Sequence, residues 1–474
     1  MKLEAKTVWM LTAVIGLTGG CALGPDYHRL AVETPGQFRF ASDSGTNSLA
    51  DLPWGQVFQD PALQDLIRVA LTNNCDLQQA VARVEQARNQ AAATRSAFLP
   101  QIGYGGDAGR GRNALYNSPA SLQGETKTSA FVDLGVAWEM DFWGRLRRLN
   151  EAARARFLAS EQARRSVTLS LVGSVTTAYF QLVELDRELA IQCSATNAYA
   201  TSYRLFNDRK INGVASKLET DRAMAALVTA AANIPDLEMQ IATTENQLNV
   251  LLGRNPGPIL RSSLSGLPPS APEIPAGLPA ALLRRRPDVL EAEQMVVAAN
   301  AGIGSSLADF FPRIGLTTLM GRASPDLSSF TSTAGNLWSV GGSVTGPLFE
   351  GGALRAQYRS SKAQFQEALA AYRQSVLVAF QEVSDALVTR EKLGEMGALD
   401  RQAITVLTSA VELATARYLN GKSSYDEVLQ AQQQLYPAQV ALARTQAGER
   451  IALVQLYKAL GGGWTEDKKT NAER

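Results

Sequence analysis

DLQQAVARVEQARNQAAATRSAFLPQIG, residues 76–103, returns 212 positions later as DVLEAEQMVVAANAGIGSSLADFFPRIG, residues 288–315. The two copies match at Asp76/Asp288, Ala80/Ala292, Ala87/Ala299, Phe98/Phe310, Pro100/Pro312, Ile102/Ile314 and Gly103/Gly315. This spacing is far too long for a solenoid, whose repeats span roughly 20–50 residues. We therefore predict a duplicated chain whose two similar halves are arranged around a pseudo-symmetry axis.

A second correspondence follows at an offset of 208 residues. Gly213, Ser216, Ala223, Leu227 and Leu252-Gly253 align with Gly421, Ser424, Ala431, Leu435 and Leu460-Gly461. The two correspondences predict a first repeat at 62–253 and a second at 280–462, joined by a proline-rich connector at 254–279. An N-terminal segment at 21–61 precedes the repeats, and a C-terminal tail at 463–474 follows them.

The composition excludes several classes of function. A net charge of +1 over 474 residues gives no electrostatic reason to expect a nucleic-acid partner. His28 is the single histidine, so we expect neither a zinc site nor a catalytic triad. The glycine-containing stretches lack a P-loop lysine. We predict a protein that is not an enzyme and that holds no metal and no dissociable cofactor.

The first residues resemble a bacterial lipoprotein signal. Lys2 and Lys6 precede an apolar run at 8–17, which is too short to span a membrane as a helix, and small residues stand directly before Cys21. We expect cleavage of a signal peptide at 1–20, with diacylglycerol and an N-acyl chain on Cys21. An ordinary signal peptide with an incidental cysteine is the alternative. Because Ala22 is not aspartate, lipoprotein sorting favours the outer membrane.

Long helices are indicated by the spacing of apolar residues. Between Arg145 and Ile211 there is no proline, and a heptad pattern runs through Leu171, Val175, Ala178, Leu182, Leu185 and Leu189. A second long helix is expected at 354–419, where Tyr372, Val376, Ala379, Val383 and Ala386 repeat the pattern. A helix of about 66 residues would be about 100 Å long.

Two shorter helices accompany each long one. They are expected at 76–98 and 214–252 in the first half, and at 288–310 and 424–460 in the second. Each pair has a combined rise of about 90 Å, which suits two short helices stacked beside one long helix. Gly213 and Gly421 make the reversals, whereas Pro235 and Pro437 should kink the shorter helices. This layout keeps Cys75 and Cys193 too far apart to pair.

Four strands are expected between the helices. Residues 130–139 alternate between an apolar face and a small or polar face, with partners around 102–105, 314–320 and 338–344. Such strands suit a membrane β-barrel, although a soluble sheet packed on helices is the alternative. Since four strands cannot close a barrel around an interior, other copies of the chain must complete it.

The chain resembles the TolC-like outer-membrane efflux proteins, in particular the lipoprotein branch serving resistance-nodulation-division (RND) pumps. The resemblance extends from Cys21 to Gly461. It is carried by Gly24-Pro25-Asp26-Tyr27, Trp54, the segment 58–63 (FQDPAL), Asp76-Leu77, the segment 138–145 (WEMDFWGR), the segment 285–288 (RRPD), Phe311-Pro312, Arg417-Tyr418 and Gly421.

The resemblance implies a homotrimer with a mixed membrane α/β fold. A twelve-stranded β-barrel, four strands per chain, would continue into a long α-helical coiled-coil barrel, and segment 21–61, the connector and the tail would surround its equator. The protein would be the passive duct of a tripartite pump, working with a periplasmic adaptor and an inner-membrane RND transporter to expel drugs or other small toxic compounds. A duct for protein secretion and a lipid-anchored structural coiled coil are the alternatives.

The resemblance also implies a gate and a docking surface at the reversals. The gate candidates are Asp426, Glu427 and Gln430 with the first-half equivalents Leu218, Glu219 and Arg222, and Arg222 is expected to pair with an acidic neighbour. The adaptor-docking candidates are Gly213, Val214, Ala215, Ser216, Gly421, Lys422, Ser423 and Ser424. The competing interpretation is an ordinary solvated helix start and plain turn chemistry.

Overall fold

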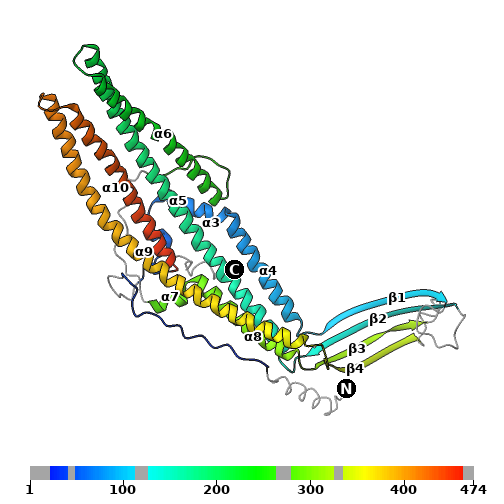
Figure 1. Cartoon of the computed structure of the whole chain (residues 1–474). Coiled ribbons are helices and arrows are strands. Elements are labelled where there is room, and N and C mark those ends of the chain that lie inside the picture. Colours follow the sequence, from blue (N-terminus) through cyan, green and yellow to red (C-terminus); the bar gives the residue numbers. More distant parts are fainter. Residues whose placement is uncertain (1–21, 41–47, 113–125, 263–278, 325–334, 463–474) are drawn as a thin grey trace. The chain divides into compact units, whose positions relative to one another are not determined.

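The computed structural model describes residues 22–40, 48–112, 126–262, 279–324 and 335–462 (Figure 1). The expected signal peptide, Cys21, most of the connector and the tail lie outside these residues. The chain divides into two compact units. The sheet unit comprises residues up to Ala31, Arg83–Glu161 and Glu291–Arg373, and the helical unit comprises Val32–Ala82, Gln162–Leu290 and Gln374 onwards.

The duplication is visible in the bounds of the secondary structure. Helix α4 (Cys75–Ser96) and strand β1 (Gln101–Arg112) are followed, 212 positions later at both ends, by α8 (Pro287–Ala308) and β3 (Arg313–Ser324). The first repeated stretch therefore encodes a helix and a strand of identical length in each half.

The second offset is conserved equally well. Helices α5 (Arg145–Ile211) and α6 (Lys217–Leu251) return 208 positions later as α9 (Ala353–Leu419) and α10 (Tyr425–Ala459). Both long helices have 67 residues, as the heptad pattern predicted. Neither Pro235 nor Pro437 interrupts its helix.

The sheet unit contains one antiparallel sheet in the order β1-β2-β3-β4, seen as adjacent curved strands in Figure 1. Its other two members are β2 (Thr126–Met140) and β4 (Asn336–Thr345). The register pairs Gly105 with Asp133 and Asp133 with Gly321, which places these three residues on one face. Strands β1 and β4 are the edges, and each has a partner on one side only.

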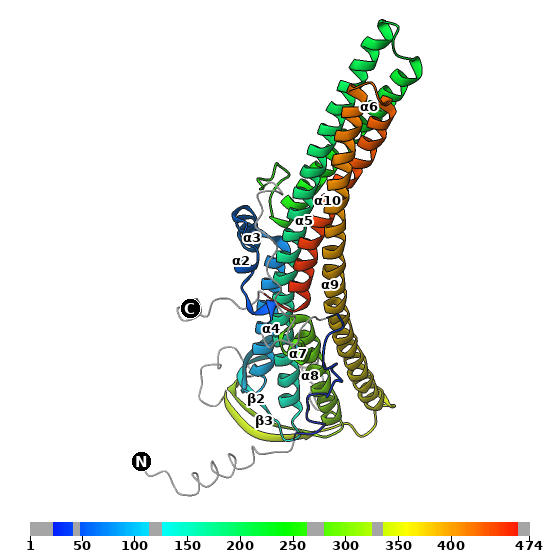
Figure 2. The same cartoon turned by 90° about the vertical axis from the view of Figure 1, so that its left-hand side faces the viewer.

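The helical unit has its core along α5 and α10, which run close to each other in Figures 1 and 2. Of the expected heptad residues on α5, Leu171, Val175, Ala178 and Leu182 are buried, whereas Leu185 and Leu189 are partly exposed. An apolar 18-residue stretch of α5 could cross a membrane by length and composition, but 61% of it is buried inside the protein, as in a core helix.

Short helices before the two repeated stretches were not predicted. They are η2 (Leu49–Asp51), α2 (Trp54–Val57), α3 (Pro61–Asn73) and α7 (Pro279–Arg285). Asp60 caps the N-terminus of helix α3, and its side chain accepts a hydrogen bond from the amide of Ala62. Short helices of this kind carry too few periodic residues to be recognised from pattern alone.

One smaller expectation is confirmed. Cys75 and Cys193 are free thiols, as the helix layout required. The basic run before α8 is held by ion pairs, with Arg286 bonded to Asp288 and Glu382 and Arg285 bonded to Asp51.

Candidate functional site

The reversals at the ends of the long helices have the same geometry in both halves. Gly213 and Gly421 adopt left-handed backbone conformations, with φ of +74° and +67°. The amides of Val214 and Lys422 donate to the carbonyls of Arg209 and Arg417 at 2.8 and 2.9 Å, which satisfies the last turn of each helix. A side chain at either glycine would meet no neighbour, so the turn requires glycine for its backbone angle.

The predicted gate residues are brought together across α6 and α10. Arg222 Nη1 lies 3.0 Å from Asp426 Oδ1, and both side chains are about half exposed. Gln430 Nε2 donates to the other oxygen of Asp426 at 3.1 Å. The expectation that Arg222 pairs with an acidic neighbour is confirmed, and the neighbour is a gate candidate of the opposite half.

The remaining gate candidates make local contacts. Glu427 lies 3.8 Å from Arg417 of the adjoining helix. The side chain of Glu219 accepts a hydrogen bond from the backbone amide of Ser216 at 2.8 Å, which completes a capping box at the start of α6. Leu218 is 60% exposed. Asp426 and Glu427 lie in the first turn of α10, where carboxylates also stabilise the helix dipole.

The docking candidates form two exposed loops with unequal helix starts. Ser216 caps α6 with its side chain, whereas Ser424 makes no side-chain cap on α10. Within the described residues the hydroxyl of Ser423 is buried without a hydrogen-bond partner. Val214 is 75% exposed, so an apolar side chain stands in the first loop where the second loop carries Lys422.

An aromatic cluster lies beneath the reversals and joins α5, α9 and α10. Phe206 and Tyr418 both pack edge-on against Tyr425, with ring centroids 4.6 and 5.2 Å away. Ser202 shares a hydrogen bond with the hydroxyl of Tyr425, and Arg209 donates to Tyr418. This cluster was not predicted from the sequence, although the aromatic residues at 199, 203 and 206 of α5 indicate it.

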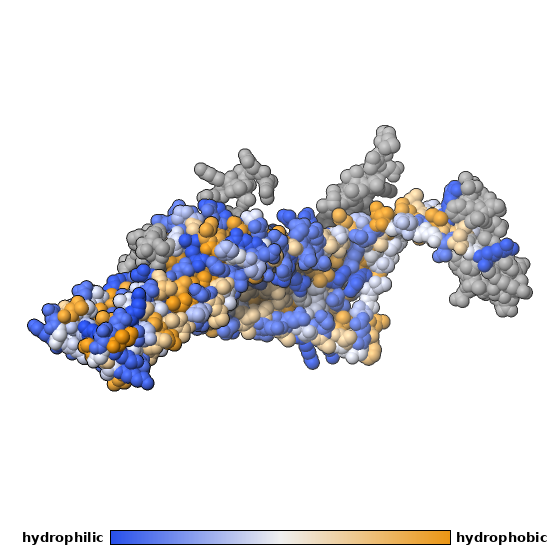
Figure 3. Space-filling model, turned by 90° about the horizontal axis from the view of Figure 1, so that it is seen from above, coloured by the Kyte–Doolittle hydropathy of each residue, from blue (hydrophilic) through white to orange (hydrophobic). Residues whose placement is uncertain are grey.

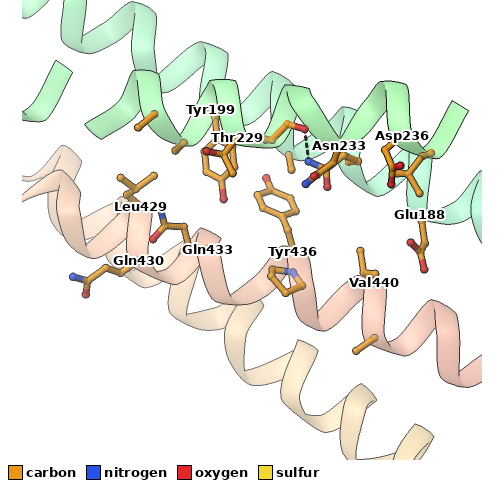
Figure 4. A pocket seen from close by; sticks show the side chains of 18 of the residues that line it. Glu188, Tyr199, Thr229, Asn233, Asp236, Leu429, Gln430, Gln433, Tyr436 and Val440 are labelled. Atoms are coloured by element: carbon orange, nitrogen blue, oxygen red, sulfur yellow. Dashed lines mark hydrogen bonds between the residues drawn. The ribbon is translucent and has the colours of Figure 1, made fainter. Parts of the chain in front are cut away.

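A groove of about 920 Å³ continues from the gate candidates between α5, α6 and α10 (Figure 4). Its lining includes Tyr199, Asn233, Asp236, Gln433 and Tyr436. The rings of Tyr199 and Tyr436 meet edge-on inside it at 5.8 Å.

An ion pair between the buried carboxylate of Glu188 and the exposed guanidinium of Arg444 lies at the far end of this groove. Glu188 is 4% exposed and receives two hydrogen bonds from Arg444, at 2.5 and 3.0 Å. Burial, with the nearby carboxylate of Glu188, raises the pKa of Glu184 to about 7. The pair joins α5 of the first half to α10 of the second, and no sequence motif predicted it.

The two faces of the sheet differ in chemistry. One face carries exposed apolar side chains, including Tyr104, Val132, Leu134, Trp338 and Val340. Hydrophobic residues gather over this part of the molecule in the view of Figure 3. The opposite face carries small or polar residues such as Gly103, Gly105, Asp133, Gly341 and Ser343, identified by the strand register. This division suits a wall between lipid and water.

The residues that follow Cys21 are held tightly within the sheet unit. The buried guanidinium of Arg148 bonds the carbonyls of Leu23 and Gly24 at 3.1 and 3.2 Å and Asp26 at 2.7 Å. Asn300 donates to the carbonyl of Pro25 at 2.8 Å.

Within the described part of the chain, no group of three or more histidine, cysteine, aspartate or glutamate side chains could hold a metal ion. The features that remain are a sheet with two open edges, long paired helices and a charged reversal.

Comparisons with known proteins agree on one family. The family model described as "Outer membrane efflux protein" matches residues 66–254 and 278–462. The probable efflux pump outer membrane protein TtgC of Pseudomonas putida is 36% identical over 467 residues, which are 97% of this chain and 96% of the relative. The probable outer membrane lipoprotein SilC of Salmonella typhimurium is 31% identical, with coverage of 96% and 98%.

Solved structures show the same likeness. The MtrE outer membrane channel of Neisseria gonorrhoeae, solved in its open state, superposes with a TM-score of 0.85 at 30% identity. The match covers 95% of this chain and 100% of that one.

Proposed function

This chain belongs to the outer membrane efflux protein family, and from that membership we propose that three copies of it form the exit duct of a tripartite efflux pump. The duct would be passive, with energy supplied by the inner-membrane transporter. Membership confirms the resemblance noted in the sequence, the outer-membrane location and the absence of enzymatic activity. It argues against a lipid-anchored structural coiled coil.

The open sheet carries the proposal. Four strands with unpaired edges at β1 and β4 leave two rows of backbone amides and carbonyls that must be satisfied in a membrane. Joining β4 of one copy to β1 of the next satisfies both rows, and three copies close a twelve-stranded barrel. The apolar face would then meet lipid and the small, polar face would line the interior.

Helix α9 supplies an independent argument for assembly. Beyond its buried heptad residues it carries a second heptad row, here called the α9 seam: Met396, Leu399, Ala403, Val406, Ala410 and Leu413. All six are exposed in the single chain, with Leu399, Val406 and Leu413 at 65%, 61% and 63%. An apolar row at 3–4 residue spacing on a long helix is suited to packing against a helix of a neighbouring copy.

The anchor and the partners belong to the same proposal. Cys21 would carry diacylglycerol and an N-acyl chain, and one relative of this chain is a probable outer membrane lipoprotein. A periplasmic adaptor would dock at the reversal loops, and an inner-membrane RND transporter would supply drugs or other small toxic compounds. The gate would be formed by Asp426, Glu427 and their neighbours at the same end.

Imaging tests the duct first. Negative-stain images of detergent-extracted protein should show three-fold end views with stain in the centre, and planar bilayers containing the protein should show discrete conductance steps. Solid rods or compact monomers without conductance would refute the duct. Mass spectrometry of the N-terminal peptide, compared with Cys21→Ser, tests the lipid.

A further inference from the structure

The small-residue face of the sheet holds an aspartate in a row of glycines. Asp133 on β2 is paired with Gly105 of β1 on one side and with Gly321 of β3 on the other. Gly135 follows two residues along the same strand and shares the face. The carboxylate of Asp133 thus has glycines on both neighbouring strands and at Gly135, whereas Phe131 lies two residues before it on the same face.

These glycines leave space that the carboxylate uses. A Cβ at Gly105 would come within 2.5 Å of Oδ1 of Asp133, so the aspartate leans over the neighbouring strand. A Cβ at Gly321 would lie 3.0 Å from the Cα of Asp133 and 2.3 Å from the carbonyl oxygen of Val132. Among the described residues Asp133 has no hydrogen-bond or ion-pair partner.

The other charges on this face lie apart from Asp133 or are paired. Glu139 is bound by Arg145 at 2.7 Å, and Arg313 lies 3.3 Å from Asp309. Lys127 is paired with Gly111 in the register near the far end of β2. Asp107 of β1, diagonal to Asp133 and exposed, is the one other acidic residue along the middle of this face.

We propose that Asp133 sets the charge selectivity of the barrel interior, where three copies would form a ring of carboxylates that favours cationic over anionic solutes. The inference rests on the proposed trimer. Charged side chains that ring a pore select for ions of opposite sign. The ring would act at the membrane level and independently of the gate candidates on α10.

Ionic strength decides how strongly this ring acts. The screening length is about 8 Å at 0.15 M salt and about 30 Å at 0.01 M. A ring in a wide, water-filled lumen should therefore discriminate weakly at physiological salt and more strongly in dilute salt.

The first experiment measures reversal potentials of the trimer in planar bilayers across a KCl gradient, at about 0.01–0.1 M. In dilute salt we expect Asp133→Asn to lower the potassium-to-chloride permeability ratio about twofold, with the difference shrinking as salt rises. Ser343→Asn, a neutral change on the same face, is the matched control and should leave the ratio unchanged. The comparison is repeated in an Asp426→Asn, Glu427→Gln background to remove the contribution of the gate.

A second measurement is insensitive to the gate. Ser339 is exposed on the same face of β4, and Ser339→Cys can be placed in a Cys75→Ser, Cys193→Ser background. From the extracellular side, a cationic thiosulfonate should label this thiol faster than an anionic one, and Asp133→Asn should reduce that preference about twofold.

The outcomes separate the inference from the function it rests on. A protein that forms no conducting trimer would refute the proposed duct. A conducting trimer whose permeability ratio and labelling preference are unchanged by Asp133→Asn would refute the selectivity role alone. A fall in both quantities, with Ser343→Asn unaffected, supports it.

Discussion

The two halves of this chain share their backbone and differ in their side chains. Helices α5 and α9 have equal lengths and a constant offset, yet Glu184 and Glu188 of α5 correspond to Lys392 and Met396 of α9. The arginine at 444 of α10 has an aspartate, Asp236, as its counterpart on α6. Duplication thus conserved the path of the chain, whereas divergence decided which surfaces are buried, charged or free.

The consequence is clearest in the long helices. In α5 the face with Leu171, Val175 and Leu182 is buried and Glu188 is covered with its arginine. The α9 seam begins at the α9 positions equivalent to Glu188, Ile191 and Ala195. These α5 residues are buried, whereas Met396, Leu399 and Ala403 of α9 are exposed. Both halves therefore contribute to the interior of the protomer, and α9 in addition retains an apolar surface for a neighbour.

The largest effect should come from charging the α9 seam. Leu399→Asp with Val406→Asp should abolish the trimer, since each lost apolar contact costs about 2 kcal/mol and three interfaces are affected together. Native gel electrophoresis and light scattering in detergent would follow the oligomeric state. Thr405→Asp, an exposed change away from the seam, serves as the control. Trimers that survive the double change would end the claim that α9 is the interface helix.

Next in size is the ion pair of the buried Glu188 with the exposed Arg444, which has no counterpart in the other half. Arg444→Met leaves the carboxylate of Glu188 buried without its partner and should cost about 2–3 kcal/mol of stability. Denaturation midpoints in detergent measure the loss. Adding Glu188→Leu should restore most of it, because an apolar pair of similar volume replaces a salt bridge. If the double variant is as unstable as Arg444→Met alone, the loss of stability does not come from the unpaired carboxylate of Glu188.

A pH effect distinguishes Glu184 from Lys392, its counterpart in α9. The raised pKa of about 7, against an ordinary 4.5, means that the native state binds this proton more tightly than the unfolded chain. Its contribution to stability is fully present below about pH 4.5 and falls as pH rises to about 7. Glu184→Gln should remove this fall, by about 1 kcal/mol after allowance for solvent screening.

Denaturation curves between pH 4 and 8 provide the measurement for Glu184. Lys392→Gln, at the equivalent exposed position of α9, should leave the slope of stability against pH unchanged over that range. Equal slopes in the parent protein and Glu184→Gln would show that this carboxyl titrates normally.

The smallest effect concerns the link between the halves at the reversal. Arg222 and Asp426 are both about half exposed, so their ion pair should contribute only about 0.5 kcal/mol. Arg222→Gln should accordingly raise the open probability of the channel about twofold in bilayer recordings. Arg222→Lys should retain most of the closed state. Identical recordings from all three proteins would remove this pair from the gate.

Much of the fold was predictable because it depends on periodicity. The periodic stretches predicted the first and last residues of both long helices to within one residue. The repeated stretch predicted α8 and β3 as copies of α4 and β1. Helix α3 was missed because it has only 13 residues, whose pattern also suits an irregular segment.

The candidate site was predicted only where chemistry is local. Arg222 and Asp426 are near their reversals in sequence, so both were named as gate candidates and an acidic partner was expected for Arg222, although the identity of that partner was not predicted. Glu188 and Arg444 are 256 residues apart, and their meeting depends on how α5 packs against α10. The α9 seam has the same spacing as the core positions of that helix, so spacing alone cannot separate an exposed row from a buried one.

The glycine-lined face of the sheet has a kinetic consequence. A wall built from Gly103, Gly105, Gly135 and Gly341 offers few side chains with which a departing molecule could form a lasting complex. Passage through the assembled barrel should then be proportional to concentration and show no saturation, so that the turnover of the whole assembly is limited upstream. An exporter with this exit can discharge chemically dissimilar cargo without a separate affinity for each.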